Sequence, residues 1–230
     1  MKLSSIAVIP DGNRRYAMKN KLGIDRAYAR GFQKVEDLLG WTDGSGIDKV
    51  SFWALSLENF TKRSKLELRI LFKLMKMKIN DSLRNGHFKE KGIRIKFFGK
   101  LDLLPQSLVE KMHELETATQ DGARQLFIAV AYSGRDEILH AAKAVAIEAR
   151  KRKTKVEDIT EKDFESKLYS PASPDLIIRT GDVSRLSGFL PWQNTYSELY
   201  FSKKLWPEFE KRDFQRAVGF YNAAQRRFGK

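Results

Sequence analysis

Three polar segments of this sequence contain residue types that bind phosphates and divalent cations. Residues 10–17 read PDGNRRYA, residues 56–60 read SLENF, and residues 175–193 include Arg179, Arg185 and Ser187. Carboxylates hold hard cations through oxygen, and guanidinium groups donate forked hydrogen bonds that match the oxygens of a diphosphate. The residue types therefore indicate a site for phosphorylated ligands, together with a cation.

The first segment carries most of this chemistry. Asp11 can hold a cation, Gly12 lets the backbone approach a phosphate closely, and Asn13 offers amide donors. Arg14 and Arg15 present two guanidinium groups. The tripeptide Asp-Gly-Asn alone is more often an ordinary turn followed by exposed arginines, but the whole segment is more specific. The spacings of a P-loop and of a dinucleotide-binding fingerprint are both absent.

The second and third segments supply further polar groups at the ends of apolar runs. Ser56, Glu58 and Asn59 follow one such run, although a helix cap with a solvent-facing carboxylate is the commoner use of these residues. Arg179 ends another apolar run, and Arg185 and Ser187 follow it on a predicted loop. Together they predict a second anion site. Two diphosphate sites imply two diphosphate substrates. Surface arginines are the alternative, but they fit poorly with an apolar strand that ends in arginine.

A further carboxylate lies within an aromatic run. Residues 196–201 read YSELYF, and residues 206–209 read WPEF. An unpaired carboxylate is costly to bury, so Glu198 is predicted to have a metal ion or an arginine as its partner.

Short apolar runs alternate with longer amphipathic segments along the whole chain. This alternation predicts a single α/β domain over residues 1–230, with a central, mostly parallel sheet flanked by helices. The polar segments then meet at the carboxyl edge of the sheet, where open α/β sheets usually bind ligands. The predicted strands are 6–10, 49–55, 93–98, 126–132 and 175–179, and the predicted helices are 25–39, 66–85, 106–121, 136–151 and 211–227.

The composition limits the classes of function. There are 43 Lys and Arg residues against 29 Asp and Glu residues, a formal charge of +14. This excess favours nucleic acids, anionic membrane surfaces or diphosphates without choosing among them. No nucleic-acid recognition motif accompanies it, so no nucleic-acid partner is predicted. The absence of cysteine excludes disulfides, thiolate metal sites and a cysteine nucleophile. Neither a signal peptide nor a membrane span is evident, so the cytoplasm is the expected location.

The motifs together resemble those of the cis-prenyltransferases, which include undecaprenyl diphosphate synthase and dehydrodolichyl diphosphate synthase. The resemblance rests on the blocks DGNRRYA, SxENF, IRTG, RLSxFLxWQ, YxELYF and WPEF. These blocks occur in the family's order from residue 6 to residue 228. The resemblance therefore covers essentially the whole chain, and it implies the fold of undecaprenyl diphosphate synthase.

The resemblance implies a reaction and a set of site residues. The expected activity joins isopentenyl diphosphate to an allylic diphosphate with a new Z double bond, in the presence of Mg²⁺. Asp11 and Glu198 would bind magnesium, and Asn59 would assist proton removal. The allylic diphosphate would lie against Gly12, Asn13, Arg14 and Arg15, flanked by Tyr16. Further substrate contacts would come from Ser56, Leu57, Glu58 and Phe60, and the homoallylic diphosphate would bind Arg179, Arg185, Leu186 and Ser187.

Three positions depart from the family's pattern. Tyr28 replaces a histidine and Ile24 replaces an arginine, and both usual residues touch the allylic diphosphate. Arg26 or Arg30 could compensate. The segment before the next arginine is one residue longer than usual, so Arg63 is assigned the site role, with Lys62 as the alternative.

These departures leave the primer and the product length open and keep two other hypotheses in view. One is a prenyltransferase with an unusual donor, acceptor or coupling regiochemistry. The other is a non-catalytic subunit, against which the retained Asp11, Asn59, Arg179 and Glu198 argue. The ending at residues 226–229 resembles that of homodimeric members, so a homodimer is expected. A long product would draw the enzyme to a bilayer, which leaves peripheral membrane contact open. The apolar stripe on the helix at 66–85 would then be either core or the wall of a product tunnel.

Overall fold

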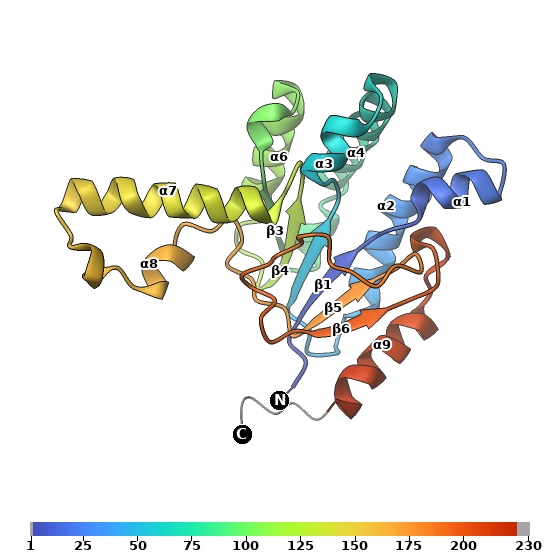
Figure 1. The fold of residues 1–230 in the computed structure, drawn as a ribbon. Coiled ribbons are helices and arrows are strands. Elements are labelled where there is room, and N and C mark those ends of the chain that lie inside the picture. Colours follow the sequence, from blue (N-terminus) through green and yellow to red (C-terminus); the bar gives the residue numbers. More distant parts are fainter. Residues whose placement is uncertain (1, 225–230) are drawn as a thin grey trace.

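Six parallel strands form one sheet at the centre of the molecule (Figure 1). The computed structural model describes residues 2–224 of the chain. Neighbouring strands follow the order β3-β4-β2-β1-β5-β6, and every pair is parallel. The strands are β1 (Ser5–Ile9), β2 (Lys49–Trp53), β3 (Ile93–Phe98), β4 (Arg124–Ala129), β5 (Leu176–Arg179) and β6 (Glu198–Phe201).

The central strand β1 is apolar on both faces, as a parallel sheet covered on both sides requires. All five of its residues are buried. Ile6 and Val8 join the larger hydrophobic core on one face, whereas Ala7 and Ile9 join a smaller core on the other. This two-sided burial is why the run has no polar alternation in the sequence.

Helices cover both faces of the sheet. They are α1 (Asn13–Lys19), α2 (Ile24–Trp41), α3 (Leu57–Lys62), α4 (Lys65–Asn85), α5 (His87–Glu90), α6 (Gln106–Ala118), α7 (Gly134–Arg152), α8 (Glu161–Glu165) and α9 (Lys211–Ala223). Single 3₁₀ turns form η1 (Leu101–Leu103), η2 (Val156–Asp158) and η3 (Trp206–Glu208).

The larger core lies under α2, α4, α6 and α9. Leu38, Leu71, Met112 and Phe214 contribute to it from these four helices. The smaller core contains Phe189 and Leu190 from the chain that follows β5. In Figure 1, α7 projects away from the sheet as an arm, and α8 lies beside it.

The predicted fold class is confirmed, and all five predicted strands are present, β3 with its predicted ends and the other four with at least one end shifted. The predicted helices at 25–39, 66–85, 106–121 and 136–151 are also present as α2, α4, α6 and α7. The helix predicted at 211–227 begins at Lys211, and residues 225–227 lie outside the described residues. The strand β6 and the short helices α1, α3, α5 and α8 were not predicted.

Candidate active site

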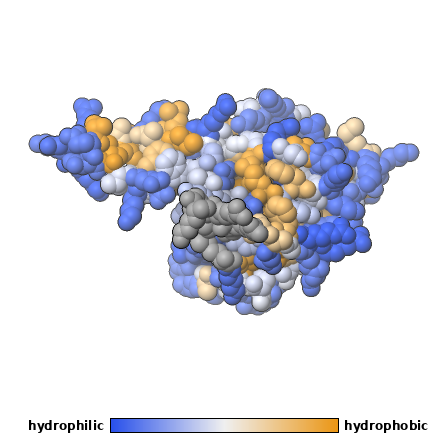
Figure 2. All heavy atoms as spheres, turned by 60° about the horizontal axis from the view of Figure 1, so that its bottom comes forward, coloured by the Kyte–Doolittle hydropathy of each residue, from blue (hydrophilic) through white to orange (hydrophobic). Residues whose placement is uncertain are grey.

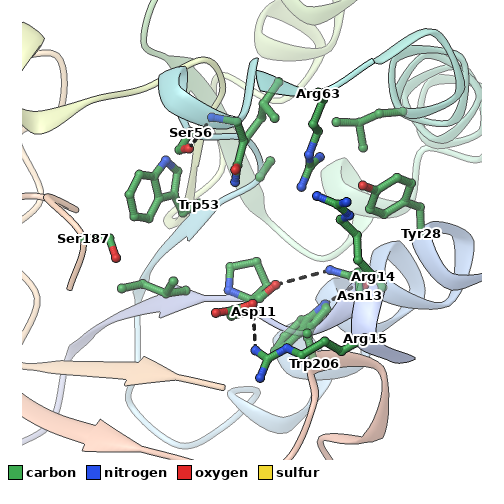
Figure 3. A pocket seen from close by; sticks show the side chains of 18 of the residues that line it. Asp11, Asn13, Arg14, Arg15, Tyr28, Trp53, Ser56, Arg63, Ser187 and Trp206 are labelled. Carbon is green, nitrogen blue, oxygen red and sulfur yellow. Dashed lines mark hydrogen bonds and ion pairs between the residues drawn. The ribbon is translucent and has the colours of Figure 1, made fainter. Parts of the chain in front are cut away.

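A cleft of about 770 Å³ opens at the carboxyl edge of the sheet (Figure 3). Ile9 is the register partner of Arg179, so the segments that follow β1 and β5 begin side by side. The segment after β2 enters from the other side. The predicted site residues that line the cleft are Asp11, Gly12, Asn13, Arg14, Arg15, Tyr28, Ser56, Glu58, Asn59, Arg63, Arg179, Arg185 and Ser187.

The turn after β1 directs the first polar segment into this cleft. Gly12 has φ +117°, a backbone conformation that strongly favours glycine. A Cβ at this position would also meet atoms of Leu205 at 2.9 Å. The chain then enters helix α1 at Asn13, so Arg14 and Arg15 lie in a helical first turn and not in an open loop.

Asp11 lies between two guanidinium groups. Its Oδ1 is 3.1 Å from Nη2 of Arg15, and its Oδ2 accepts a hydrogen bond from Nη2 of Arg179 at 3.0 Å. Its backbone oxygen accepts from the hydroxyl of Thr180 at 2.8 Å and from the backbone N–H of Trp206 at 3.0 Å. Arg15 and Arg179 therefore hold the carboxylate in place, while one third of the Asp11 side chain stays exposed.

Arg179 is the most buried cation of the site, with 5% of the residue exposed. Its Nη1 donates to the Ser187 hydroxyl at 2.8 Å and to the backbone oxygen of Arg185. Its Nε is buried without a hydrogen-bond partner. A buried guanidinium with one orphaned N–H is suited to an anion that supplies the missing acceptor. The predicted association of Arg179, Arg185 and Ser187 is thus present in the structure.

A second group of cations lies on the opposite wall, where Arg14 of α1 approaches Arg63 beside Tyr28 (Figure 3). The Arg63 guanidinium lies 5.4 Å from the centre of the Tyr28 ring, and its Nε lies 3.2 Å from Oε1 of Glu67. The Tyr28 hydroxyl donates a hydrogen bond to the same Glu67 oxygen. Burial raises the pKa of the Tyr28 phenol well above its ordinary value, and the charge of Arg63 only partly opposes the shift. The phenol is therefore a hydrogen-bond donor at neutral pH.

The segment after β2 forms the start of helix α3. The Ser56 hydroxyl accepts from the backbone N–H of Asn59 at 3.0 Å and caps the helix. Glu58 and Asn59 are exposed, and both line the cleft. The helix-cap interpretation and the cleft interpretation of this segment are therefore both correct.

Several residues predicted to contact substrate do not line the cleft. Tyr16 is buried in a small apolar cluster, and Leu186 packs against the smaller core. Leu57 and Phe60 pack against the larger core. The arginines proposed to compensate for Ile24, at positions 26 and 30, are also absent from the cleft lining, and Arg30 donates to the backbone oxygen of Pro207 instead.

Glu198 lies at the opposite edge of the sheet from Asp11. It pairs in register with Leu176 at the start of β5, whereas Arg179 at the end of β5 pairs with Phe201. Three residues of strand separate the two levels by roughly 10 Å. Within one chain Glu198 and Asp11 therefore lie at different levels of the sheet, and the predicted magnesium role of Glu198 stays a prediction.

A family model described as "Putative undecaprenyl diphosphate synthase" matches residues 9–229. The chain belongs to the cis-prenyltransferase family. Curated relatives named tritrans,polycis-undecaprenyl-diphosphate synthase (geranylgeranyl-diphosphate specific) come from Thermoplasma acidophilum and Archaeoglobus fulgidus. They are 40% and 41% identical over 98% and 93% of this chain, and the matches cover 88% and 86% of their lengths.

Two solved structures of cis-prenyltransferases have the same fold over the whole chain. Lavandulyl diphosphate synthase from Lavandula x intermedia, in complex with dimethylallyl diphosphate, has a TM-score of 0.94 and 29% identity. The similarity covers 100% of this chain and 99% of that one. A probable undecaprenyl diphosphate synthase from Campylobacter jejuni has a TM-score of 0.81 and 31% identity, with both chains fully covered.

Three residues near this cis-prenyltransferase cleft were missed by the sequence analysis. Trp53 lines the cleft with its ring stacked on Phe189 at 4.8 Å, and its Nε1 is buried without a partner. Trp206 donates from Nε1 to the backbone oxygen of Gly31 at 2.8 Å, which ties η3 to α2. Glu67 lies behind the cleft wall. Its spacing from Ser64 is that of a helix cap, and Ser64 does cap α4, so the sequence contains no separate sign of the contact with Tyr28.

Proposed function

We propose that this enzyme extends geranylgeranyl diphosphate by Mg²⁺-dependent addition of isopentenyl units. The family's reaction is a Z-selective condensation of isopentenyl diphosphate with an allylic diphosphate. The observation that carries the proposal is the pair of cationic groups on opposite walls of one cleft, with Asp11 between them. The names of the curated relatives, which specify geranylgeranyl diphosphate, support this compound as the primer.

The two cationic groups would each hold one diphosphate. Arg14 and Arg63 would bind the allylic diphosphate, and Arg179 with Ser187 would bind isopentenyl diphosphate. The allylic C–O bond breaks, the isopentenyl double bond attacks the resulting allylic carbon, and a proton leaves the new C–C unit. Asn59 lines the same cleft and would help to remove that proton. Held donors are effective here because they meet the charge that grows on the leaving diphosphate.

The donor set of the cleft fits magnesium. No cluster of three or more Asp, Glu, His or Cys residues suited to a metal occurs between residues 2 and 224. Magnesium usually keeps several waters and binds through one or two carboxylates plus substrate phosphates, so Asp11 with a bound diphosphate is a sufficient set. When bound, the ion would neutralise charge on the departing diphosphate.

The apolar part of the substrate would enter the space between the sheet and the helices α2 and α4. Phe32, Phe52 and Ala54 line both the cleft and a smaller apolar slot of about 70 Å³. Met75 and Ile79 of the α4 stripe continue that slot. The slot is much smaller than the cleft, at about 70 Å³ against about 770 Å³, so a long prenyl chain would require α2 and α4 to move apart.

A primer series tests this proposal. Purified enzyme is incubated with Mg²⁺, labelled isopentenyl diphosphate and each of dimethylallyl, geranyl, farnesyl or geranylgeranyl diphosphate. We expect the highest kcat/KM with geranylgeranyl diphosphate. A product formed from dimethylallyl diphosphate without incorporation of isopentenyl diphosphate would instead favour an unusual coupling. The similarity to lavandulyl diphosphate synthase is the specific reason for this alternative. Inactivity with every primer, combined with activation of another subunit, would favour a non-catalytic subunit.

The enzyme is also proposed to form a homodimer through β6. This strand is an edge of the sheet, and exposed apolar side chains lie nearby, with Leu199 38% and Phe220 42% exposed.

Figure 2 shows apolar side chains on the α7–α8 arm and on the adjacent body. Leu139 and Ile147 are exposed on α7. Among the described residues β6 is the last strand of the sheet, and an exposed apolar surface beside it favours association with a second copy. The ending at residues 226–229, which first suggested a dimer, lies outside the described residues.

The proposed location is the cytoplasm, with contact at the membrane surface through the lipid product. No helix between residues 2 and 224 has the length and apolar character needed to span a bilayer. Addition of lipid vesicles should raise the turnover number without changing the product, because a vesicle takes up the long prenyl product as it is released. Such a rise would support contact with the membrane surface.

A further inference from the structure

The residue that replaces the usual histidine takes part in a network of three side chains. The hydroxyl of Tyr28 donates to Oε1 of Glu67, and the Nε of Arg63 lies 3.2 Å from that same oxygen, an ion-pair contact without the geometry of a hydrogen bond. The three residues come from α2, the end of α3 and the first turn of α4. The side chains of Arg63 and Glu67 are only 14% and 15% exposed. Water therefore screens this ion pair less than it screens a surface pair.

Glu67 stands behind the wall of the cleft. Tyr28, Arg63 and Arg14 line the cleft, whereas Glu67 does not. Because the Nε side of Arg63 faces Glu67, its two terminal amino groups are free to point the other way. Figure 3 shows the Arg63 guanidinium directed toward that of Arg14. The positive charges of Arg14 and Arg63 repel each other unless an anion lies beside them. The single carboxylate of Glu67 balances only one of these charges.

We propose that Glu67 is a positioning residue for the allylic diphosphate, acting through Arg63 and Tyr28. It fixes the guanidinium of Arg63 with its forked end toward the cleft. The hydroxyl of Tyr28 holds the Glu67 carboxylate in place through its hydrogen bond. Neither Arg26 nor Arg30 lines the cleft, so neither supplies a cation to this wall. This inference rests on the proposed function, because it assigns this wall to the allylic substrate.

The inference predicts a selective kinetic effect. Glu67→Gln keeps the shape of the side chain and removes its charge. The KM for geranylgeranyl diphosphate should rise roughly tenfold, which is typical for loss of a charged hydrogen-bond partner. The KM for isopentenyl diphosphate should stay at the wild-type value, because Arg179 and Ser187 are untouched. Equal changes in both KM values, or no change in either, would overturn the proposal.

Changes at Tyr28 test the network without altering a charge. Tyr28→Phe removes only the hydroxyl and should raise the same KM by a smaller factor. In the double variant Tyr28→Phe/Glu67→Gln, the two effects should be less than multiplicative because both act through one hydrogen bond. Multiplicative effects would show that the two residues act independently and would contradict the network.

A matched control and a binding measurement separate the possible failures. Glu114→Gln makes the same change in an exposed ion pair with Lys111 on α6 and should leave both KM values unchanged. Binding of the unreactive analogue geranylgeranyl S-thiolodiphosphate, measured by calorimetry, should be roughly tenfold weaker in Glu67→Gln. If the wild-type protein binds the analogue but makes no product, the proposed function fails. The comparison of analogue binding between wild type and Glu67→Gln then still tests this inference. Equal affinity in both proteins would refute the inference even if the enzyme is active.

Discussion

At the scale of single residues, Arg179 donates hydrogen bonds to three partners in the cleft. It joins Asp11 to Ser187 and keeps one buried N–H without a partner. Lysine at this position would keep the charge but could not make these forked contacts. Arg179→Lys should therefore lower kcat/KM for isopentenyl diphosphate roughly 10- to 100-fold. Steady-state kinetics with isopentenyl diphosphate varied would measure it.

The control for this prediction is Arg212→Lys. Arg212 is an exposed arginine of α9 that pairs with Glu210, and its replacement should have no kinetic effect. If Arg179→Lys kept wild-type kcat/KM, the second diphosphate site would not involve this guanidinium.

The sequence predicted the residues that meet along strand ends but not those that meet across helices. Asp11 and Arg179 follow apolar strands, so their placement at one edge of the sheet followed from the predicted parallel sheet, whereas the direct contact between them depends on a strand order that was not predicted. The contact between Tyr28 and Glu67 joins helices whose relative rotation depends on packing, which a single sequence does not specify. The predicted magnesium role of Glu198 stays a prediction, and its place at the start of β6, away from Asp11, could not be foreseen because this short strand was not recognised.

At the scale of elements, long apolar patterns were predicted reliably and short elements were not. Strand β3 was predicted with its observed ends because alternating burial and β-branched residues coincide there. Strand β6 has only four residues and an exposed Leu199, so it resembled a polar-aromatic loop. Helix α1 has seven residues, too few to show an apolar period, and it begins directly after a turn that requires glycine.

The pairing of α2 with α4 should control product length. Met75 is 2% exposed and lines the apolar slot between the sheet and these helices. Met75→Ala should lower the free energy of unfolding by about 2–5 kcal/mol through the cavity it leaves. The same cavity should shift products toward longer chains, which chromatography of the dephosphorylated products would measure. Unchanged products in a destabilised variant would show that the prenyl chain does not enter the slot.

At the scale of the whole molecule, the edge strand β6 should govern association. A charge at Leu199 would face the partner in a dimer that uses this edge, so Leu199→Asp should shift the molecular mass measured by light scattering from dimer to monomer. Leu103→Asp is the matched control, since Leu103 on η1 is 40% exposed and Leu199 is 38% exposed. Dimers in both variants would place the interface elsewhere.

Stability should fall at alkaline pH because of a buried tyrosine. Burial, with the nearby Glu137 carboxylate, raises the pKa of Tyr132 above its ordinary value near 10. Above pH 10 the unfolded chain releases a proton that the folded chain retains, so rising pH favours unfolding. Urea unfolding should therefore show wild type losing up to about 1.4 kcal/mol per pH unit above pH 10 that Tyr132→Phe does not lose. A difference between the two proteins that does not change with pH would contradict this.

The double-bond geometry of the product tests the central claim most directly. Purified enzyme, Mg²⁺, isopentenyl diphosphate and geranylgeranyl diphosphate should yield a polyprenyl diphosphate in which every newly formed double bond is Z, as determined by NMR. Asp11→Asn should abolish this product, because the cleft would lose its cation-binding carboxylate. New E double bonds, or wild-type activity in Asp11→Asn, would contradict the account.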